Sequence, residues 1–236
     1  KESVFSGHML VDTEGKNVDD ALGIVSFYDI SYRNQDGNYV FQNFDITAAQ
    51  EEDFRILKVN SPEIISGQIK GLFKLSELNK LASNALGHIY DIGDEYVVTP
   101  NQSLDFDFVV YNKIAKVISE YLNIGEDGTL RGHLESDSQK FKVNLYASLI
   151  SSKGFSADHI SLELDNDNPL YNTFAEIGQL RTPYFNAKDL SLINVTRRDT
   201  LFVKTQFKGD GAASDRYDVN LYYTKGEQNK SILGFR

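Results

Sequence analysis

Histidines and carboxylates are the residues of this chain that could do acid–base or metal chemistry, and their spacing favours neither. The four histidines lie at positions 8, 88, 133 and 159, so none has the i+2 or i+4 spacing of a local metal-binding pair. Asp165 and Asp167 have the spacing that opens a calcium loop, but the glycine and the closing glutamate of that loop are missing. We therefore predict no metal site and no bound cofactor.

Motifs of nucleophilic and phosphate chemistry are also missing. The sequence contains no cysteine, which excludes disulfides, thiolate metal ligands and a thiol nucleophile. It has no Gly-x-Ser-x-Gly elbow, no phosphate-cradling glycine loop and no dinucleotide-binding fingerprint. Adjacent acids such as Glu51 and Glu52 are typical of an acidic surface, and none is distinguished as a general acid. The sequence thus predicts a protein that is not an enzyme.

Charge and composition argue against several other classes of protein. A net charge of −10 without a basic cluster argues against nucleic acid as a partner and against adhesion to an anionic membrane surface. No stretch approaches the ~18 to 20 apolar residues that span a bilayer. No signal peptide opens the chain, which starts at Lys1 without a methionine. We expect the sequence to be a fragment of a longer protein.

The run ISGQIKGLFKL at residues 65–75 is the most informative strand pattern. In an extended chain alternate residues share a face, so its isoleucines, its glycines and Phe73 line one side. Glycine is unfavourable inside a strand unless something approaches the backbone closely. Gly67 and Gly71 on the apolar side therefore predict a curved sheet or a guest molecule lying against it, and hence a groove.

Two helical patterns interrupt the strands. Apolar residues recur at helical spacing from Leu78, and the spacing repeats 36 residues later from Ile114. We expect short amphipathic helices near 76–89 and 112–123, which either close the ends of an ordinary β core or form a lid over a ligand. Their predicted sheet-facing residues are Leu78, Leu81, Leu86, Val117, Ile118 and Leu122.

Nearly everything else alternates, most regularly from Phe141 to Leu149. Successive strands with short turns predict an antiparallel meander, and so many strands must curl or stack to cover an apolar face. The predicted fold class is therefore mainly β, a long curved antiparallel sheet (a β-taco or groove) with two short amphipathic helices. We expect residues 1–236 to form a single β-groove domain.

Several segments resemble TamB, the translocation and assembly module protein of the AsmA-like superfamily. They are ISGQIKG at 65–71 with the helix after it, GTLRGHL at 128–134, YDVNL at 217–221 and NKSILG at 229–234. The resemblance implies a taco-shaped sheet with an apolar interior that crosses the periplasm from an inner-membrane anchor towards a TamA-like outer-membrane protein. It implies outward movement of phospholipid and support of outer-membrane protein assembly. It supplies no catalytic positions.

A lipid conduit agrees with the physical pattern. Each methylene removed from water is worth ~0.8 kcal/mol, so exposing a tail of roughly sixteen carbons costs on the order of 10 kcal/mol, which an apolar gutter avoids. The predicted lipid-binding residues are Ile65, Ile69, Phe73, Phe141, Val143, Leu145, Ala147, Leu149, Ile160, Leu162, Leu164, Leu201, Val203, Phe207, Val219 and Leu221. The expected partners are phospholipid and, through regions outside this sequence, the TamA-like protein.

Two other readings stay open at this point. The same side chains could fill the closed core of a sandwich or barrel, as in a structural or adhesin-like scaffold. A lipocalin-like carrier would close into a barrel by pairing its first and last strands, whereas an extensible conduit needs open edges.

Overall fold

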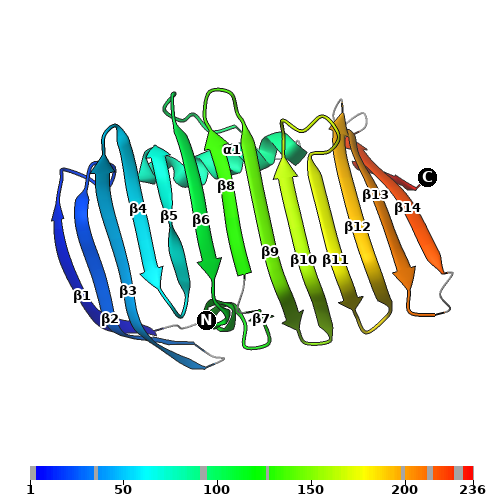
Figure 1. The fold of residues 1–236 in the computed structure, drawn as a ribbon, viewed down its shortest axis with the longest axis horizontal. Coiled ribbons are helices and arrows are strands. Elements are labelled where there is room, and N and C mark those ends of the chain that lie inside the picture. The colour runs from blue at the N-terminus through cyan, green and yellow to red at the C-terminus, as the bar shows by residue number, and fades with distance from the viewer. Residues whose placement is uncertain are drawn as a thin grey trace.

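A computed structural model describes residues 4–34, 37–90, 95–125, 128–197, 200–211, 215–225 and 231–235. Within these ranges the chain forms one antiparallel sheet of 15 strands and two α-helices (Figure 1). The predicted fold class, a mainly β curved antiparallel sheet with two short helices, is confirmed.

The elements follow one another in a long meander. The first part comprises β1 (Val4–Glu14), β2 (Leu22–Arg33), β3 (Asn38–Glu51), β4 (Phe54–Ser61), β5 (Ile65–Leu72), a 3-10 turn (Leu75–Glu77), α1 (Leu78–Tyr90), β6 (Ser103–Val110) and α2 (Asn112–Ile118). The second part comprises β7 (Asn123–Ile124), β8 (Gly128–Glu135), β9 (Phe141–Ser152), β10 (Phe155–Asp165), β11 (Thr173–Arg181), β12 (Asn186–Arg197), β13 (Thr200–Gly209), β14 (Arg216–Lys225) and β15 (Ser231–Phe235).

Strand order follows chain order, apart from the short β7, which pairs with β9. Among the described strands β1 and β15 are the two edges, and they do not pair with each other. The sheet is therefore open, and the lipocalin-like alternative, which needs paired first and last strands, is wrong for the described fold.

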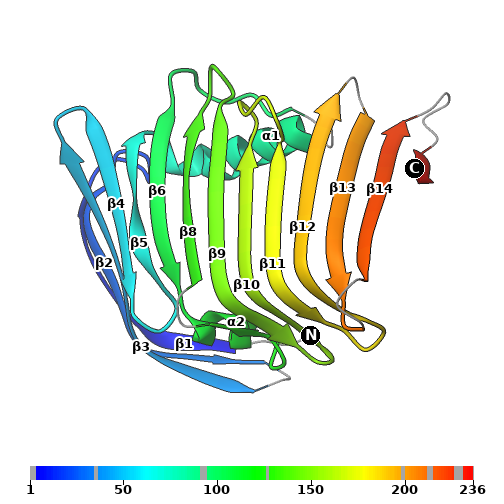
Figure 2. The ribbon, with the colours of Figure 1, turned by 45° about the vertical axis from the view of Figure 1, so that its right-hand side comes forward.

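Sharp bends give the sheet its curvature. Asp29, His159 and Asp189 have positive φ angles of 52°, 52° and 49°. At His159 the pairing between β9 and β10 is interrupted but its register is unchanged, because Ile160 pairs with Ala147 and Asp158 with Leu149. A left-handed residue inside a strand changes its direction. Figure 2 shows the lower ends of the middle strands bending.

Helix α1 lies across several strands on one face of the sheet, called here the inner face (Figures 1 and 2). Its buried residues are Leu81, Ala85 and Ile89. Because an α-helix turns by about 100° per residue, these three lie within about 80° of each other around the helix axis. Leu86 projects about 100° from the centre of this stripe and is 40% exposed. The prediction that Leu86 packs on the sheet is therefore wrong.

Polar contacts fix both ends of α1. At its start the Asp19 carboxylate accepts hydrogen bonds from the Ser76 N–H and hydroxyl, at 2.8 and 2.7 Å. At its end the Thr196 hydroxyl donates to the carbonyl of Ile89 at 2.7 Å, which satisfies a carbonyl that a helix terminus leaves unpaired. The Tyr90 hydroxyl lies 3.0 Å from that of Thr173. The helix is thus held at both ends.

Helix α2 is shorter than predicted and lies at the other end of the inner face. It ends at Ile118 because Ser119 is extended, so Leu122 lies outside it. Ala115 is its fully buried residue, whereas Ile118 is 71% exposed, so the predicted sheet contacts of both Ile118 and a helical Leu122 are wrong. Lys113 lies over the Phe41 ring, 5.3 Å from its centroid, because β2 and β3 bend towards this helix (Figure 2).

Candidate functional site

One uninterrupted line of inner-face side chains crosses the sheet at right angles to its strands. We call it the central row; it takes one residue from each strand from β1 to β14 except β7. Its members, each paired with the next, are Val11, Val25, Ile46, Val59, Gly67, Phe108, Leu130, Leu145, Leu162, Ala175, Leu192, Thr205 and Val219. Directly paired residues share a face of a sheet, so the row forms an almost wholly apolar strip.

The central row is open to solvent. Val11 is 53% exposed and the other members are half-buried, with none fully buried. A parallel line lies under α1 and is called here the helix-covered row. It consists of Arg55, Gly71, Leu104, Leu134 and Phe141, and all of them are buried. The chain therefore fills one band of its inner face and leaves the central row only partly covered, with Ile46 and Leu162 packed against the core cluster on one side.

Glycines let aromatic rings lie flat along the floor of the groove. A Cβ built on Gly67 would lie 2.6 Å from the Phe108 ring, and one built on Gly132 would lie 2.4 Å from the Phe106 ring. The two phenylalanine rings are stacked, with centroids 6.5 Å apart. The close approach predicted at Gly67 is thus explained by a ring of the same chain, and at Gly71 by the backbone of Ser103 and Leu104 on the paired strand. Neither requires a guest molecule.

The structure places the predicted lipid-binding residues on the inner face, with one exception. Leu149 pairs with Asp158, the neighbour of the buried core residue Ala157. Its side chain therefore shares the polar outer face, because the bend at His159 changes which residues of these strands point inward. Regular alternation along the sequence cannot reveal that bend, so the placement of Leu149 with the inner-face residues is wrong.

Burial divides the predicted residues further. Phe73, Phe141, Ala147 and Leu164 are 2–8% exposed, and thus they belong to the protein's own core. Those on the central row are Leu145, Leu162 and Val219; the others on the inner face, half-buried beside it, are Ile65, Ile69, Val143, Ile160, Leu201, Val203, Phe207 and Leu221. Only part of the predicted set is therefore open surface, and three of its residues lie on the central row.

Sequence reasoning identified only Leu145, Leu162 and Val219 of the central row. It missed most of the middle members, such as Phe108, Leu130, Ala175 and Leu192, and the whole part on the first four strands. Val11, Val25, Ile46 and Val59 continue the row to the edge strand β1. Their signal is the pairing of consecutive hairpins, because residues opposite each other in an antiparallel pair share a face. Alternation within a single strand contains no such information about its neighbours.

The outer face is charged, as an alternating sheet requires. Lys142 lies 3.1 Å from Glu163 and 3.3 Å from Asp165, and hydrogen bonds to these carboxylates raise the pKa of the Lys142 ammonium. Lys142, Asn144 and Tyr146 are exposed, in agreement with their predicted outward orientation. No member of the central row is titratable, so this strip offers contact area and no acid–base chemistry.

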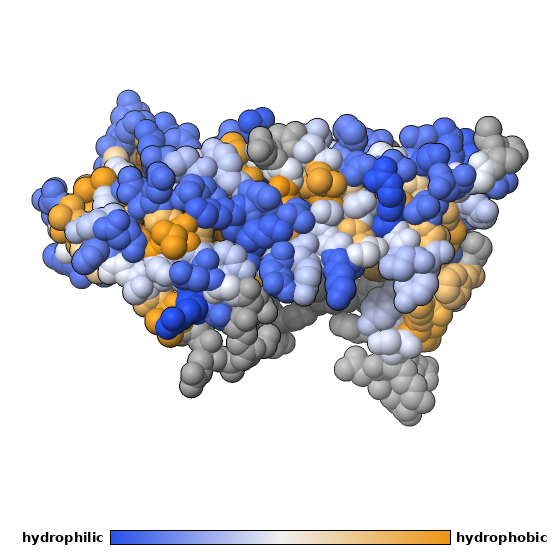
Figure 3. Space-filling model, turned by 90° about the horizontal axis from the view of Figure 1, so that it is seen from below, coloured by the Kyte–Doolittle hydropathy of each residue, from blue (hydrophilic) through white to orange (hydrophobic). Residues whose placement is uncertain are grey.

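The outer face becomes apolar near β15. Ile193, Val195, Phe202 and Tyr222 line a shallow hollow of about 720 Å³ across β12, β13 and β14. Figure 3, the view from below, shows apolar side chains at this end of the molecule. Ile193 and Phe202 are 36% and 45% exposed. The hollow lies on the opposite face from the central row.

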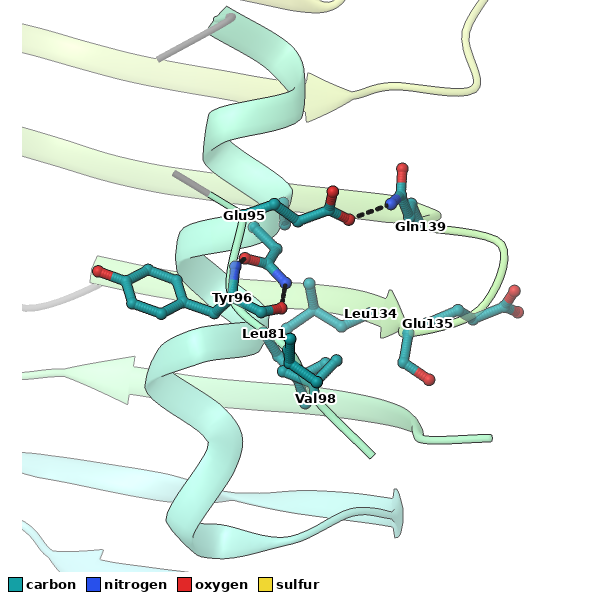
Figure 4. A pocket seen from close by; sticks show the side chains of 11 residues that line it. Leu81, Glu95, Tyr96, Val98, Leu134, Glu135 and Gln139 are labelled. Carbon is teal, nitrogen blue, oxygen red and sulfur yellow. Dashed lines mark hydrogen bonds between the residues drawn. The ribbon is translucent and has the colours of Figure 1, made fainter. Parts of the chain in front are cut away.

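A smaller cleft of about 300 Å³ lies beside α1 (Figure 4). Its apolar floor contains Leu81 and Leu134, and Glu95 binds the Gln139 amide at 2.9 Å at its rim. The Asn84 side chain exchanges two hydrogen bonds of 2.8 Å with the backbone of Tyr96, which holds the segment around Tyr96 against the helix. The cleft is a feature of how α1 is packed and does not open onto the central row.

Across the described ranges, no cluster of three or more histidine or acidic residues could hold a metal ion. In the same part of the chain, no helix has the length and apolar character needed to cross a bilayer.

Comparison with family models, with curated proteins and with solved structures gave no significant match. The resemblance to TamB therefore rests on the sequence segments alone.

Proposed function

We propose that this chain is a lipid-conduit segment of a TamB-like protein that holds phospholipid acyl chains against the central row. In this proposal it works in the periplasm of a Gram-negative envelope, in a protein anchored in the inner membrane. Phospholipid moves along it towards the outer membrane, and the parent protein meets a TamA-like partner and supports outer-membrane protein assembly.

The observation that carries the proposal is an apolar row that its own chain covers only in part. A filled scaffold core would bury the row, whereas each of its members keeps solvent exposure. Large exposed apolar strips on soluble proteins are binding surfaces far more often than accidents. The scaffold reading explains the helix-covered row but not the central row beside it.

The direction of the row suits transport along the molecule. It runs across the strands, so at a strand spacing of ~4.8 Å it extends for about 55–60 Å. Each lipid methylene that stays in contact with it is spared a hydration cost of ~0.8 kcal/mol. Contacts of nearly constant apolar character along the row keep this energy similar at successive positions, so a tail can slide without a large barrier.

Photocrosslinking in cells tests the proposal. A photoreactive amino acid at Leu145 of the full-length protein should capture phospholipid, whereas one at Asn144 should not, because Leu145 is on the central row and Asn144 is on the outer face. Leu162 and Glu163 on β10 provide a second matched pair. Lipids are identified by mass spectrometry of the purified adduct.

Equal labelling at Leu145 and Asn144 would mean incidental contact with lipid and would overturn the proposal. An absence of phospholipid at both Leu145 and Leu162 would instead favour a scaffold. Labelling at Phe141, which is 5% exposed under α1, measures the background expected of a packed inner-face residue.

A further inference from the structure

A buried arginine lies beside the end of the central row near β1. Arg55 of β4 is 7% exposed. Its guanidinium donates to three backbone carbonyls of the loop between β1 and β2, those of Val18 and Ala21 at 2.9 Å and that of Asp19. Its Nε atom is buried and has no hydrogen-bond acceptor.

The charge of this guanidinium is not neutralised by an ion pair. No carboxylate of the described residues lies within 4.0 Å of it. Its neutral neighbours are the loop carbonyls and the Phe73 ring, 5.9 Å away. The carboxylate of Asp19 is turned to Ser76, and hydrogen bonds from Ser76 lower its pKa, with smaller contributions from the charges of Lys74 and Arg55. A buried charge without a counterion is costly, so an anion would be favoured here.

Arg55 lines a pocket of about 450 Å³ that opens onto the central row. The pocket is lined by two members of that row, Val25 and Ile46. Ala48 and Leu57 add to the apolar surface of the pocket. Arg55 lies four residues from Val59 along β4, about 13 Å in an extended strand. The rim has one charge of each sign, Glu14 and Lys16. A single molecule can therefore touch both the row and the arginine.

We propose that this pocket binds the head group of an anionic amphiphile whose acyl chain lies on the central row, which names the ligand class of the function proposed above and rests on it. The head group is an oxyanion, either a carboxylate or a phosphate. It gives the guanidinium the negative counterion that the described residues do not supply. It replaces a loop carbonyl as acceptor of guanidinium N–H bonds. The exchange is favourable because the oxyanion adds Coulombic attraction and bidentate geometry to these bonds. The Val18 carbonyl belongs to a residue that is 55% exposed, so water can bind it once it is released.

Binding of four probes that share a sixteen-carbon chain to the purified protein tests this ligand class. Palmitate and palmitoyl lysophosphatidic acid are anionic, whereas hexadecanol and methyl palmitate are neutral, and all are titrated below their critical micelle concentrations. We expect the anionic probes to bind at least 10-fold more tightly than the neutral ones. Tighter binding of palmitate would assign a carboxylate, and tighter binding of the lysolipid a phosphate; either result supports the proposal.

Two variants locate the effect. Arg55→Met should bring the ratio of the affinities for anionic and neutral probes to within about twofold of one. The affinity for hexadecanol should not change. Because that variant also loses the loop contacts, Ala48→Phe is the second test: it fills the pocket, keeps the arginine, and should abolish the preference as well. Ala49→Phe, which adds the same ring at the exposed neighbouring position on the other face of β3, is the control and should retain it.

Equal affinity for anionic and neutral probes would overturn the inference while leaving the conduit intact. A preference that survives Ala48→Phe would also overturn it, because the anion would then be bound elsewhere. Failure of all four probes to bind, together with no lipid labelling at Leu145, would reject the conduit itself.

Discussion

Leu130 and Leu134 lie on the same strand, point to the same face and are four residues apart, yet they belong to different surfaces. Leu134 is 8% exposed beneath α1 and joins the main core cluster. Leu130 lies on the central row and stays half-buried. The comparison teaches that alternation sets the direction of a side chain, while a helix from elsewhere in the chain decides whether that side chain becomes core or surface.

The largest expected effect separates these two leucines. Leu134→Asp places a charge under α1, where it cannot be solvated, and should lower the free energy of unfolding by more than about 3 kcal/mol. Leu130→Asp leaves the charge on an open surface and should cost about 1 kcal/mol. Urea denaturation followed by circular dichroism measures both. Equal losses would mean that the central row is as enclosed as the helix-covered row.

A glycine substitution sharpens the comparison at the floor of the groove. A Cβ on Gly132 would lie 2.3 Å from the carbonyl oxygen of Lys142 and 2.4 Å from the Phe106 ring. Gly132→Ala should therefore destabilise the protein by about 1–3 kcal/mol, as overpacking does. Gly178→Ala is the matched control, because its nearest contact would be 3.2 Å from His159 Cβ. A melting temperature of Gly132→Ala equal to that of the control would contradict the ring placement.

The attachment of α1 gives a smaller effect. Thr196→Val removes the hydroxyl that donates to the Ile89 carbonyl and should cost about 1 kcal/mol, the typical worth of one hydrogen bond. Hydrogen exchange should show faster opening of the last turn of α1, with β1 and β2 unaffected. Uniform acceleration over the whole sheet would show that the contact supports more than the helix end.

The smallest expected effect is a pH dependence on the outer face. His133 lies 2.9 Å from Asp105 and 3.1 Å from Glu135. Burial alone would lower the pKa of its imidazole, but the hydrogen bonds and charges of these carboxylates raise it above its ordinary value of 6.5. A raised folded-state pKa stabilises the protein below the unfolded-state pKa, and this contribution is lost as the pH rises through the folded-state pKa.

His133→Gln should therefore lower stability more at pH 5 than at pH 8. The difference should be only a few tenths of a kcal/mol, because the pair is partly exposed and solvent screens it. Denaturation curves at both pH values measure it. A larger loss at pH 8 would reverse the inferred sign.

The sequence predicted the sheet, its antiparallel order and the approximate positions of both helices, because these depend on local periodicity. The run from Phe141 to Ala147 alternates inward and outward as its pattern indicates. The prediction failed at Leu149 because the bend lies in the backbone angle of His159 on the next strand, where nothing in the β9 pattern marks it.

The candidate site was predictable only in part. The pattern of β9 and β10 identified Leu145 and Leu162 as inward-facing, but not that Phe141, four residues from Leu145, lies under a helix. Arg55 is a single charge in an otherwise ordinary strand, and its burial depends on a loop that is distant in the sequence. Such features require the tertiary arrangement, since they arise from contacts between segments separated by tens of residues.

Because each strand from β1 to β14 except β7 contributes one position to the central row, the length of the row is set by how many full strands the sheet contains. Gain or loss of one hairpin changes that length by two strand spacings, about 10 Å. The pairing among all the remaining strands is preserved, since each strand contacts only its two neighbours in the meander. Evolution can therefore lengthen or shorten the central row in steps of one hairpin without changing the side chains on the remaining strands.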